Sequence, residues 1–431
     1  MVIRSVKHSL KFMNTEKMYN YASVFQLMCD TQDEILNRCW NTPIDITTKE
    51  NHYYFDIQKN ILNIPAQLPS TIFNNDKLYS RLVNSITNDT MDILRGRTEQ
   101  RRKQLYILKK LQKEKKECSK LQSYIDRNPL TQPVIKNHTF ELSSKNIEFI
   151  PTTGEFDYFI RFHSLSEDFE DIYIPIKKTA MDNKFIDDGF ELCGGILLSA
   201  TGIEFRYKKD IPLKTEGIKI GVDPGIKTLL SVSDSKGNNR QSTVLNIENV
   251  LEKLCRKKKG SKGYKRAQQE RTQLLRLASK EIDLDNVMQM GYEFFNLTGS
   301  NSSTKIKKWA YGLLKDIEEQ RCEMAGVQFI LQDCPYMSQR CQCGWVDKRN
   351  RKGKIFQCHK CGHTDDADFN SSTNHAGQEN IFDLTDWSPL IRKYKLNSKG
   401  FYWLSSGIYD EDGCCLIETI RSLESRIPLN V

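Results

Sequence analysis

Four cysteines within 21 residues constrain this 431-residue chain more than any other feature of its sequence. They form two turns separated by a basic stretch: Cys341, Cys343, Cys358 and Cys361. A tetrahedral Zn²⁺ ion bound by four thiolates requires two such knuckles, and a loop of this length can bring them together. The second knuckle has CxxC spacing, whereas the first is CxC, one residue tighter. We therefore predict a structural zinc site, in which His359 or His363 could substitute as a ligand. The alternative is a set of free cysteines left by a decayed site.

A carboxylate ends an alternating apolar strand in the middle of the chain. Residues 218–222 lead to Asp223 in an Asp-Pro-Gly turn, and the alternating run from Thr228 to Val232 then predicts a hairpin. An aspartate before Pro-Gly can serve only the turn. A carboxylate fixed on a sheet is also a good ligand for a hard cation such as Mg²⁺, which takes oxygen donors in a fixed geometry.

Two further acidic residues come from separate segments downstream. A strand is predicted from Asn286 to Glu293, and Asp368 stands in TDDADFN, where a helix of small residues begins. Asp368 could instead cap that helix. Three carboxylates from three segments are what two-metal hydrolysis of a phosphodiester needs, because carboxylates hold the two cations. We therefore predict Asp223, Glu293 and Asp368 as the catalytic, Mg²⁺-binding residues.

The net charge of +9 is concentrated in two stretches. A predicted helix within residues 94–124 carries eleven cations against three acids, and residues 250–280 carry eleven against two. Gly260 and Gly263 predict a flexible basic loop that enters a helix. Phosphates are the natural compensating charge, so nucleic-acid contact is predicted for both stretches, with a solvated surface as the alternative. The residues predicted to make this contact are Arg101, Arg102, Lys103, Lys109, Lys110, Arg256, Lys257, Lys258, Lys259, Lys265 and Arg266.

The remaining sequence indicates the domain layout. Residues 15–128 are mostly helical by periodicity, with helices over Tyr19–Trp40 and Leu78–Leu94 before the basic helix. Residues 133–212 contain short runs rich in β-branched and aromatic residues, which predict a small barrel or sandwich. The amino-terminal segment could supply its first strand, which would make the helical block an insertion. Downstream, we predict a helix from Thr304 to Ala325 that stops at Gly326, and then a strand from Val327 to Leu331.

No apolar run approaches the roughly 18 residues of a membrane span, and the amino terminus lacks the apolar core of a secretion signal. We therefore expect a cytoplasmic protein without membrane contact. Clustered cysteines in that compartment favour metal binding over disulfides.

The order of these segments is specific. A GVDPG strand, a strand with a glutamate, a helix and strand leading to SQRC, a cysteine hairpin and then DADFN resemble the RuvC-type nuclease half of transposon-encoded TnpB proteins and of their descendants, the compact type V CRISPR effectors. The resemblance is strongest over residues 304–376, extends more loosely to Asp223, and covers residues 1–210 only in layout.

The resemblance implies an α+β multidomain fold. It consists of an RNase H-like (RuvC) mixed-sheet nuclease domain with an inserted zinc ribbon, and a β-barrel wedge domain that carries a helical recognition insertion. The implied boundaries are 1–14 for the first wedge strand, 15–132 for the recognition domain, 133–212 for the wedge barrel, 213–333 and 365–385 for the nuclease domain, 334–364 for the zinc ribbon and 386–431 for a tail, for which no function is predicted.

The resemblance also implies RNA-guided cleavage of DNA with two Mg²⁺ ions per site. The partners would be a guide RNA, either omega-RNA-like or a crRNA with scaffold, and target DNA, both double- and single-stranded. The family follows its glutamate with an acidic or amide residue and Leu, whereas Phe294 and Phe295 follow Glu293, so Asp285 is an alternative ligand.

Two other functions stay open: a nuclease-inactive RNA-guided repressor, and a transposition accessory protein that binds DNA without a guide. Also open are a transposon or CRISPR context and a monomeric or homodimeric state. The resemblance implies a prokaryotic cytoplasm, with action at the nucleoid.

Overall fold

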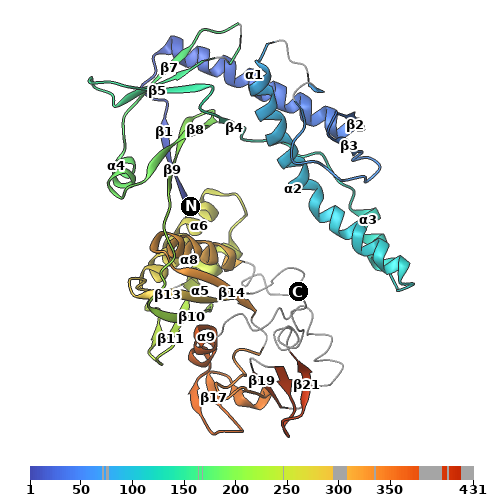
Figure 1. Cartoon of the computed structure of the whole chain (residues 1–431), viewed down its shortest axis with the longest axis vertical. Coiled ribbons are helices and arrows are strands. Elements are labelled where there is room, and N and C mark those ends of the chain that lie inside the picture. Colours follow the sequence, from blue (N-terminus) through green and yellow to red (C-terminus); the bar gives the residue numbers. More distant parts are fainter. Residues whose placement is uncertain are drawn as a thin grey trace, which may run out of the picture. The chain divides into compact units, whose positions relative to one another are not determined.

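The computed structural model describes residues 1–69, 72–73, 77–163, 165–166, 168–245, 247–294, 308–333, 336–377, 400–404 and 407–418. The chain divides into two compact units, Met1–Lys209 and Asp210–Val431 (Figure 1). The sequence suggests nearly the same boundary, between residues 212 and 213. No helix in the described ranges is both long enough and apolar enough to cross a membrane.

The first unit contains two antiparallel sheets. The first has the order β1 (Val2–Ser9), β9 (Gly202–Lys209), β8 (Glu191–Ser199) and β4 (Thr139–Leu142). The second has the order β5 (Ile147–Pro151), β6 (Tyr158–Phe162) and β7 (Ile172–Ile176). β1 pairs with β9 along its whole length, so the amino-terminal segment is a strand of this sheet, as predicted. Among the described residues, no strand pair closes either sheet into a barrel.

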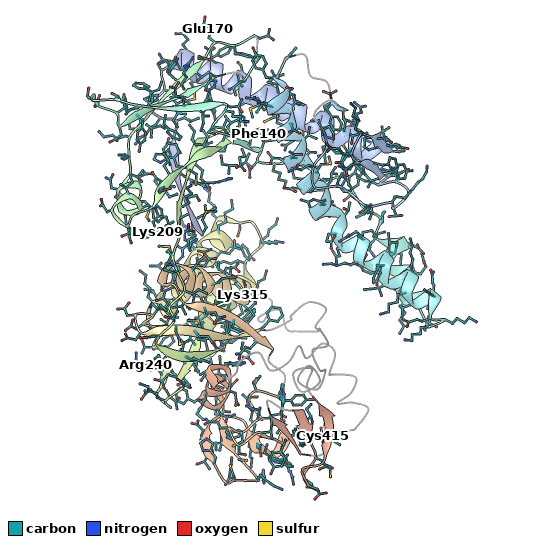
Figure 2. The ribbon with its side chains drawn as sticks, viewed as in Figure 1. Phe140, Glu170, Lys209, Arg240, Lys315 and Cys415 are labelled. Carbon is teal, nitrogen blue, oxygen red and sulfur yellow. The ribbon has the colours of Figure 1, made fainter. Side chains whose placement is uncertain are left out.

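Three helices and a short hairpin lie between β1 and β4 in sequence, as the predicted insertion requires. They are α1 (Thr15–Asn41), β2 (Ile44–Thr47), β3 (His52–Phe55), α2 (Ser80–Lys113) and α3 (Ser119–Arg127). The prediction of separate helices on either side of Leu94 is wrong, because α2 runs through that point without a break. No proline interrupts it, and the single Gly96 is tolerated inside a long helix. Phe140 of β4, labelled in Figure 2, is fully buried and packs against Phe25 of α1.

A buried carboxylate organises the other end of the first unit. Asp182 begins α4 (Ala180–Asp187) in a capping box with Thr179. Its carboxylate lies 3.1 Å from Nε2 of His8 and accepts a 2.7 Å hydrogen bond from the Tyr207 hydroxyl. Burial alone would raise the pKa of Asp182, but the hydrogen bonds outweigh it and hold the pKa below its usual value. One carboxylate therefore joins β1, α4 and β9.

The second unit is built on a mixed sheet of five strands, in the order β12 (Asn239–Gln241), β11 (Leu230–Asp234), β10 (Ile218–Pro224), β13 (Val287–Phe294) and β14 (Gln328–Asp333). β10 and β11 form the predicted hairpin. β10, β13 and β14 run parallel, so their carboxyl ends meet at one edge. The predicted strands ending at Glu293 and beginning near Val327 are confirmed.

Helices cover both faces of this sheet. α5 (Ile247–Arg256), α6 (Lys262–Lys280) and α8 (Tyr311–Ala325) contribute to the apolar core that contains Val222, Met290 and Tyr292. On the opposite face, α9 (Ala367–Gly377) packs against β10, β11 and β13. α8 ends at Gly326 in the left-handed conformation (φ 66°), as predicted, but it begins at Tyr311. Residues 304–307 of the predicted helix lie outside the described ranges.

The predicted basic loop that enters a helix is present but short: residues 257–261, with Lys257, Lys258, Lys259 and Gly260, join α5 to α6. Most of residues 250–280 belong to α5 and α6, and Gly263 stands in the first turn of α6 rather than in a loop. The Ser261 side chain caps α6 by accepting from the Tyr264 amide. The helices form because each buries an apolar side, including Leu251 and Leu275, against the sheet core.

The cysteine segment and the tail together build two small sheets. One comprises β16 (Arg351–Lys352), β17 (Ile355–Gln357) and β18 (Thr364–Asp366). The other comprises β15 (Trp345–Val346), β19 (Phe401–Leu404), β20 (Gly407–Tyr409) and β21 (Cys415–Glu418). Tail residues with no predicted role therefore extend the sheet begun by β15.

Candidate functional site

Two of the predicted catalytic residues lie next to each other at the carboxyl edge of the sheet. β10 and β13 pair in parallel with Val222 opposite Tyr292, so Asp223 and Glu293 follow on neighbouring strands. Burial raises the pKa of both carboxyl groups. The charge of Asp223 raises the pKa of Glu293 further. Two neighbouring carboxyl groups, one half-buried and one buried, fit a site for a divalent cation.

The alternative ligand Asp285 lies at the other end of the same strand. It precedes the first residue of β13, Val287, and its side chain is exposed. Because β10 and β13 are parallel, the amino end of β13 lies at the opposite sheet edge from Asp223. The geometry therefore favours Glu293 over Asp285 as the partner of Asp223.

Two glycines that the sequence analysis did not identify allow α9 to pack closely on β10 and β13, beside Asp223 and Glu293. Gly221 and Gly291 are opposite each other on β10 and β13. A Cβ atom on Gly221 would lie 1.9 Å from the Ser372 carbonyl oxygen, and one on Gly291 would lie 2.1 Å from that of His375. The helix therefore rests directly on the strand backbones. Each glycine precedes its acid by two residues, so it shares a sheet face with that acid. The sequence patterns Gly-x-Asp at 221–223 and Gly-x-Glu at 291–293 could have indicated these two glycines.

Asp368 lies in the first turn of α9. Its carboxylate pairs with the Lys354 ammonium and lies 3.8 Å from the Arg351 guanidinium. About one turn further along α9, the buried Ser371 hydroxyl has no hydrogen-bond partner. It lies close enough to Asp223 to lower the pKa of that carboxyl group. Lys354 and Arg351 lower the same pKa. Asp368 thus shares its two cations with Asp223, although among the described residues its direct contacts are with the cations rather than with the other acids.

A buried histidine of α9, also missed by sequence reasoning, lies near Glu293. His375 is fully buried, and its Nδ1 lies 2.8 Å from Oε1 of Gln332 on β14. Its Nε2 lies 4.0 Å from Oε1 of Glu293. Burial lowers the pKa of His375 to about 3, so the imidazole is neutral near pH 7. With Gln332 Oε1 as the acceptor, the proton is assigned to Nδ1, and Nε2 faces Glu293.

The donor set fits hard cations. Asp223 and Glu293 offer neighbouring carboxylate oxygens, and the Ser371 hydroxyl, which has no hydrogen-bond partner, lies close to Asp223. Among the described residues the three acids do not form a metal-ligand group, and Asp368 instead contacts Lys354 and Arg351. The raised pKa values of Asp223 and Glu293 mean that these buried negative charges are only partly compensated within the protein. Oxygen ligands of this kind are those that Mg²⁺ takes.

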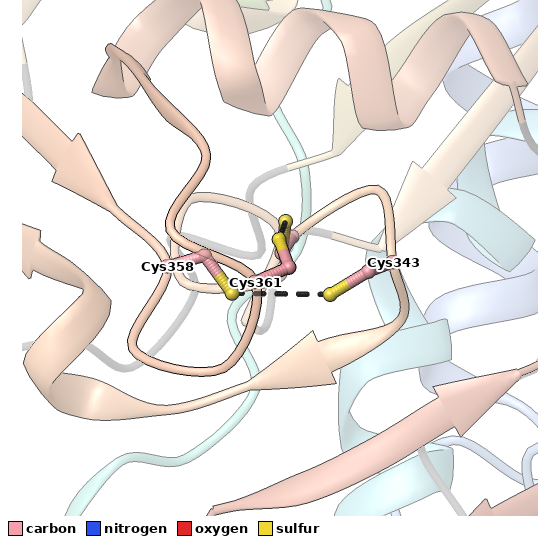
Figure 3. Close-up of side chains that lie close together, drawn as sticks. Cys343, Cys358 and Cys361 are labelled. Carbon is pink, nitrogen blue, oxygen red and sulfur yellow. Dashed lines mark hydrogen bonds between the residues drawn. The ribbon is translucent and has the colours of Figure 1, made fainter.

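The four cysteines form a metal-ligand cluster, as predicted (Figure 3). The Sγ atoms of Cys341 and Cys361 are 3.6 Å apart, and those of Cys343 and Cys358 are 3.8 Å apart. Four sulfurs at 2.3 Å from a tetrahedral Zn²⁺ would be separated by about 3.8 Å, so the tight CxC knuckle is compatible with the ion.

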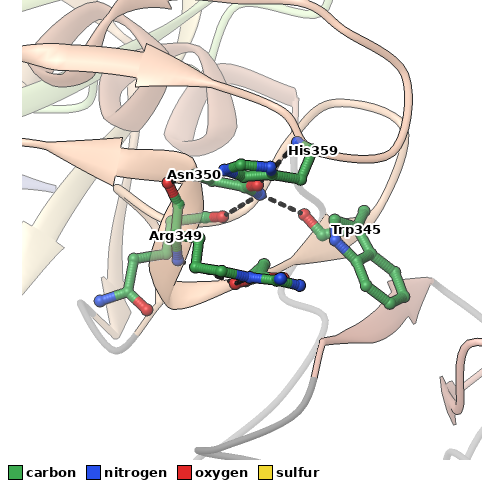
Figure 4. A network of polar contacts seen from close by, with 6 residues as sticks. Trp345, Arg349, Asn350 and His359 are labelled. Carbon is green, nitrogen blue, oxygen red and sulfur yellow. Dashed lines mark hydrogen bonds and ion pairs between the residues drawn. The ribbon is translucent and has the colours of Figure 1, made fainter.

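The two alternative histidine ligands do not join this cluster. The metal-ligand group found among the described residues consists of the cysteines alone. His359 donates its backbone N–H to Asn350, and its Nε2 lies 3.2 Å from the Arg349 carbonyl oxygen (Figure 4). The Asn350 amide in turn donates to the Trp345 carbonyl. His359 therefore stabilises the loop between the knuckles.

Comparison with known proteins places the second half of the chain. Residues 311–375 match the family model "Cas12f1-like, TNB domain". A stretch of 96 residues is 35% identical to the CRISPR-associated endodeoxyribonuclease Cas12f1 of Sulfoacidibacillus thermotolerans, and it spans 22% of this chain and 20% of that protein. The predicted resemblance to compact type V effectors is confirmed over this part of the chain.

Solved structures of such effectors resemble this chain only with TM-scores below 0.5. A Cas12f1–sgRNA–target DNA complex gives a TM-score of 0.46 at 11% identity, covering 87% of this chain and 99% of that one. CasPhi-2 (Cas12j) bound to crRNA and phosphorothioate-DNA gives 0.42 at 10% identity, covering 88% and 92%. These scores are too low to carry an argument about fold or function.

The Cas12f1-like segment contains the cysteines and most of α9, and a buried clamp joins the two. Asn370 and Asn374 both donate from α9 to the Arg340 carbonyl, each at 2.8–2.9 Å. The Arg340 guanidinium donates back to Asn374 and to the carbonyl of Trp403 in the tail. Arg340 directly precedes Cys341, so the first knuckle is fixed to the helix that carries Asp368.

The predicted nucleic-acid contacts differ in their exposure. Arg101 is only 7% exposed, and its guanidinium donates to the carbonyls of Ile125 and Asn128, which links α2 to α3. It therefore does not lie on an open surface, contrary to the prediction. The other predicted residues are exposed, namely Arg102, Lys103, Lys109, Lys110, Arg256, Lys257, Lys258, Lys259, Lys265 and Arg266.

Proposed function

We propose that this protein is an RNA-guided DNA endonuclease with one Mg²⁺-dependent carboxylate site. Asp223, Glu293 and Asp368 would hold two Mg²⁺ ions, and the four cysteines would hold a structural Zn²⁺. The observation that carries the proposal is the pairing of half-buried Asp223 with buried Glu293 on parallel strands, on the sheet face covered by the helix that contains Asp368. When bound, the Mg²⁺ ions would activate the attacking water and stabilise the leaving oxygen.

The protein's own groups have separate roles in this proposal. Asp223 and Glu293 bind from the rigid sheet, and Asp368 binds from α9. The neutral imidazole of His375 donates to Gln332 and lies near Glu293 without adding a competing positive charge. The glycine contacts hold α9 at a fixed distance from both strands. These supports keep the ligands preorganised for metal.

The proposed partners are a guide RNA and target DNA, on the basis of the match of residues 311–375 to the Cas12f1-like TNB domain and the 35% identity of 96 residues to a CRISPR-associated endodeoxyribonuclease. The exposed cations of α2, α5 and α6 support contact with a phosphate backbone. The first unit would contain the wedge and recognition domains, and the second unit the nuclease domain and zinc ribbon, with the boundaries given by the sequence.

A pair of conservative variants tests the site. Asp223→Asn and Glu293→Gln should each slow Mg²⁺-dependent DNA cleavage by about 100-fold or more, since each loses a charged metal ligand, while guided DNA binding persists. Asp285→Asn is the matched control and should cleave normally. Cleavage retained in Glu293→Gln would refute the site.

The RNA that copurifies with the chain tests the partner. A defined RNA species of guide length is expected, and its sequence would identify the target. Absence of such RNA, with direct binding to transposon-end DNA, would favour the accessory protein. Guided binding without cleavage by the unmodified chain would favour the repressor.

A further inference from the structure

We propose that Lys354 is an exchangeable internal counter-ion of the metal site, which pairs with Asp368 until a divalent cation displaces it. This inference rests on the proposed function, because it assigns Asp368 as a metal ligand. Its basis is the ion pair between the Lys354 ammonium and Oδ2 of Asp368, with the Arg351 guanidinium 3.8 Å from Oδ1. Both carboxylate oxygens therefore face a cation of the same hairpin.

The backbone sets this placement. β17 pairs with β18, with Ile355 opposite Asp366, and β18 leads directly into α9. The Lys354 carbonyl accepts a 2.7 Å hydrogen bond from the Ala367 amide, next to Asp368 in sequence. The tight turn before Lys354 uses Gly353 in the left-handed conformation (φ 65°). Lys354 is therefore held beside the first turn of α9 by its main chain.

The two cations act on more than Asp368. Both lower the pKa of Asp223, and Arg351 also lowers that of Glu293. The two positive charges of the hairpin thus act on Asp223 and Asp368, and that of Arg351 also acts on Glu293. Such charges reduce the attraction of the cluster for added cations, because like charges repel across the site.

The lysine can leave without disturbing the fold. Its side chain is 51% exposed, whereas that of Asp368 is 16% exposed, so the ammonium can move into water while the carboxylate stays. An ion pair with one exposed partner contributes modestly, which corresponds to about a two- to fivefold effect on a competing equilibrium. Lys354 should thus weaken metal binding without preventing it.

The test is direct Mn²⁺ binding to the purified, zinc-loaded full chain without guide or DNA, measured from the electron paramagnetic resonance signal of free Mn²⁺. Lys354→Met should bind Mn²⁺ about two- to fivefold more tightly than the unmodified chain. Lys354→Arg, which keeps the charge, should restore the weaker binding. Lys352→Met is the matched control, since Lys352 lies in the same hairpin and makes no ion pair with a described residue, and it should leave the affinity unchanged.

Unchanged or weaker Mn²⁺ binding by Lys354→Met would overturn the inference, as would an equal gain in Lys352→Met. Asp368→Asn separates this failure from failure of the proposed function. Where Asp368→Asn weakens binding but Lys354→Met has no effect, the metal site stands and the counter-ion role falls. If neither Asp223→Asn nor Asp368→Asn weakens Mn²⁺ binding, both the proposed metal site and the counter-ion role of Lys354 are refuted.

Discussion

Replacing Glu318 by Gln should make the protein more stable at neutral and alkaline pH. Glu318 lies on α8 inside the core of the second unit and is fully buried. Its Oε2 lies 3.5 Å from the Arg321 guanidinium, while its Oε1 has no hydrogen-bond partner. Burial raises the pKa of Glu318 to about 7, more than Ser279 and Arg321 lower it. The folded protein therefore holds a proton there that the unfolded chain releases.

The sign and size of the effect follow from this difference. The folded pKa of about 7 lies above the usual value of 4.5, so the folded state binds more protons between these values. Its free energy of unfolding must then fall as pH rises through this window. At about 1.36 kcal/mol for each pKa unit, the loss approaches about 3 kcal/mol well above pH 7, with most of it between about pH 5 and pH 8.

Chemical denaturation at about pH 5 and about pH 8 measures this loss. Glu318→Gln keeps the side-chain volume but cannot ionise, so its stability relative to the unmodified chain should increase by about 2 kcal/mol between the two pH values. Glu319→Gln is the matched control, because Glu319 is the next residue, is 43% exposed and pairs with Lys315. A stability gap that is the same at both pH values for Glu318→Gln would refute the reasoning.

Three further changes test other parts of the structure. Gly291→Ala should cost about 1–3 kcal/mol through its clash with α9, whereas Gly312→Ala, which meets nothing within 4 Å, should cost nothing in thermal unfolding. Asp182→Asn should lower the free energy of unfolding of the first unit by about 3 kcal/mol, measured by urea titration against the exposed Asp187→Asn. Cys343→Ser should reduce bound zinc below about one ion per chain, as measured by colorimetric release, and an unchanged zinc content would exclude the four-cysteine site.

Local sequence patterns were sufficient to predict the strands that carry Asp223 and Glu293. Alternating apolar residues predicted the β10–β11 hairpin and the strand ending at Glu293, because one face of each strand packs in the core. The cysteine spacing predicted the cluster for a similar reason: the ligands of one ion must come from two short turns. The stop of α8 at Gly326 followed from the freedom of glycine to adopt the left-handed conformation.

Features that depend on distant partners were not predicted. The role of Gly221 and Gly291 appears only when α9, about 80 residues or more downstream of Gly291, is laid on the sheet. Arg101 has the charge of a surface residue, but α3 folds back to supply carbonyl acceptors for it. The tail strands add to β15 across a long sequence separation, so their own alternation gave no partner. In each case the deciding contact lies outside the local sequence window.

Most of the small polar residues of α9 are buried because the helix packs between the sheet and the first cysteine knuckle. Asn370 and Asn374, four residues apart, share one side of the helix and bind the first cysteine knuckle through the Arg340 carbonyl. Ser371 and His375, also four residues apart, lie toward Asp223 and Glu293 on the sheet. The helix is therefore bonded on one side to the first cysteine knuckle through Asn370 and Asn374, and on the other side to β14 through His375 and Gln332.

The position of Asp368 follows from this double attachment. The neighbouring Ala367 is buried with Cys341 and Cys358 in the core of the cysteine cluster, and the glycines of β10 and β13 fix the other side of α9. Loss of zinc would release one attachment and leave the other intact, so Asp368 would stay near the sheet but lose its angular constraint. Because metal ligands must be held to within about 0.5 Å of their productive geometry, we expect the proposed zinc site and the proposed carboxylate site to be coupled mechanically, even though they would share no ligand.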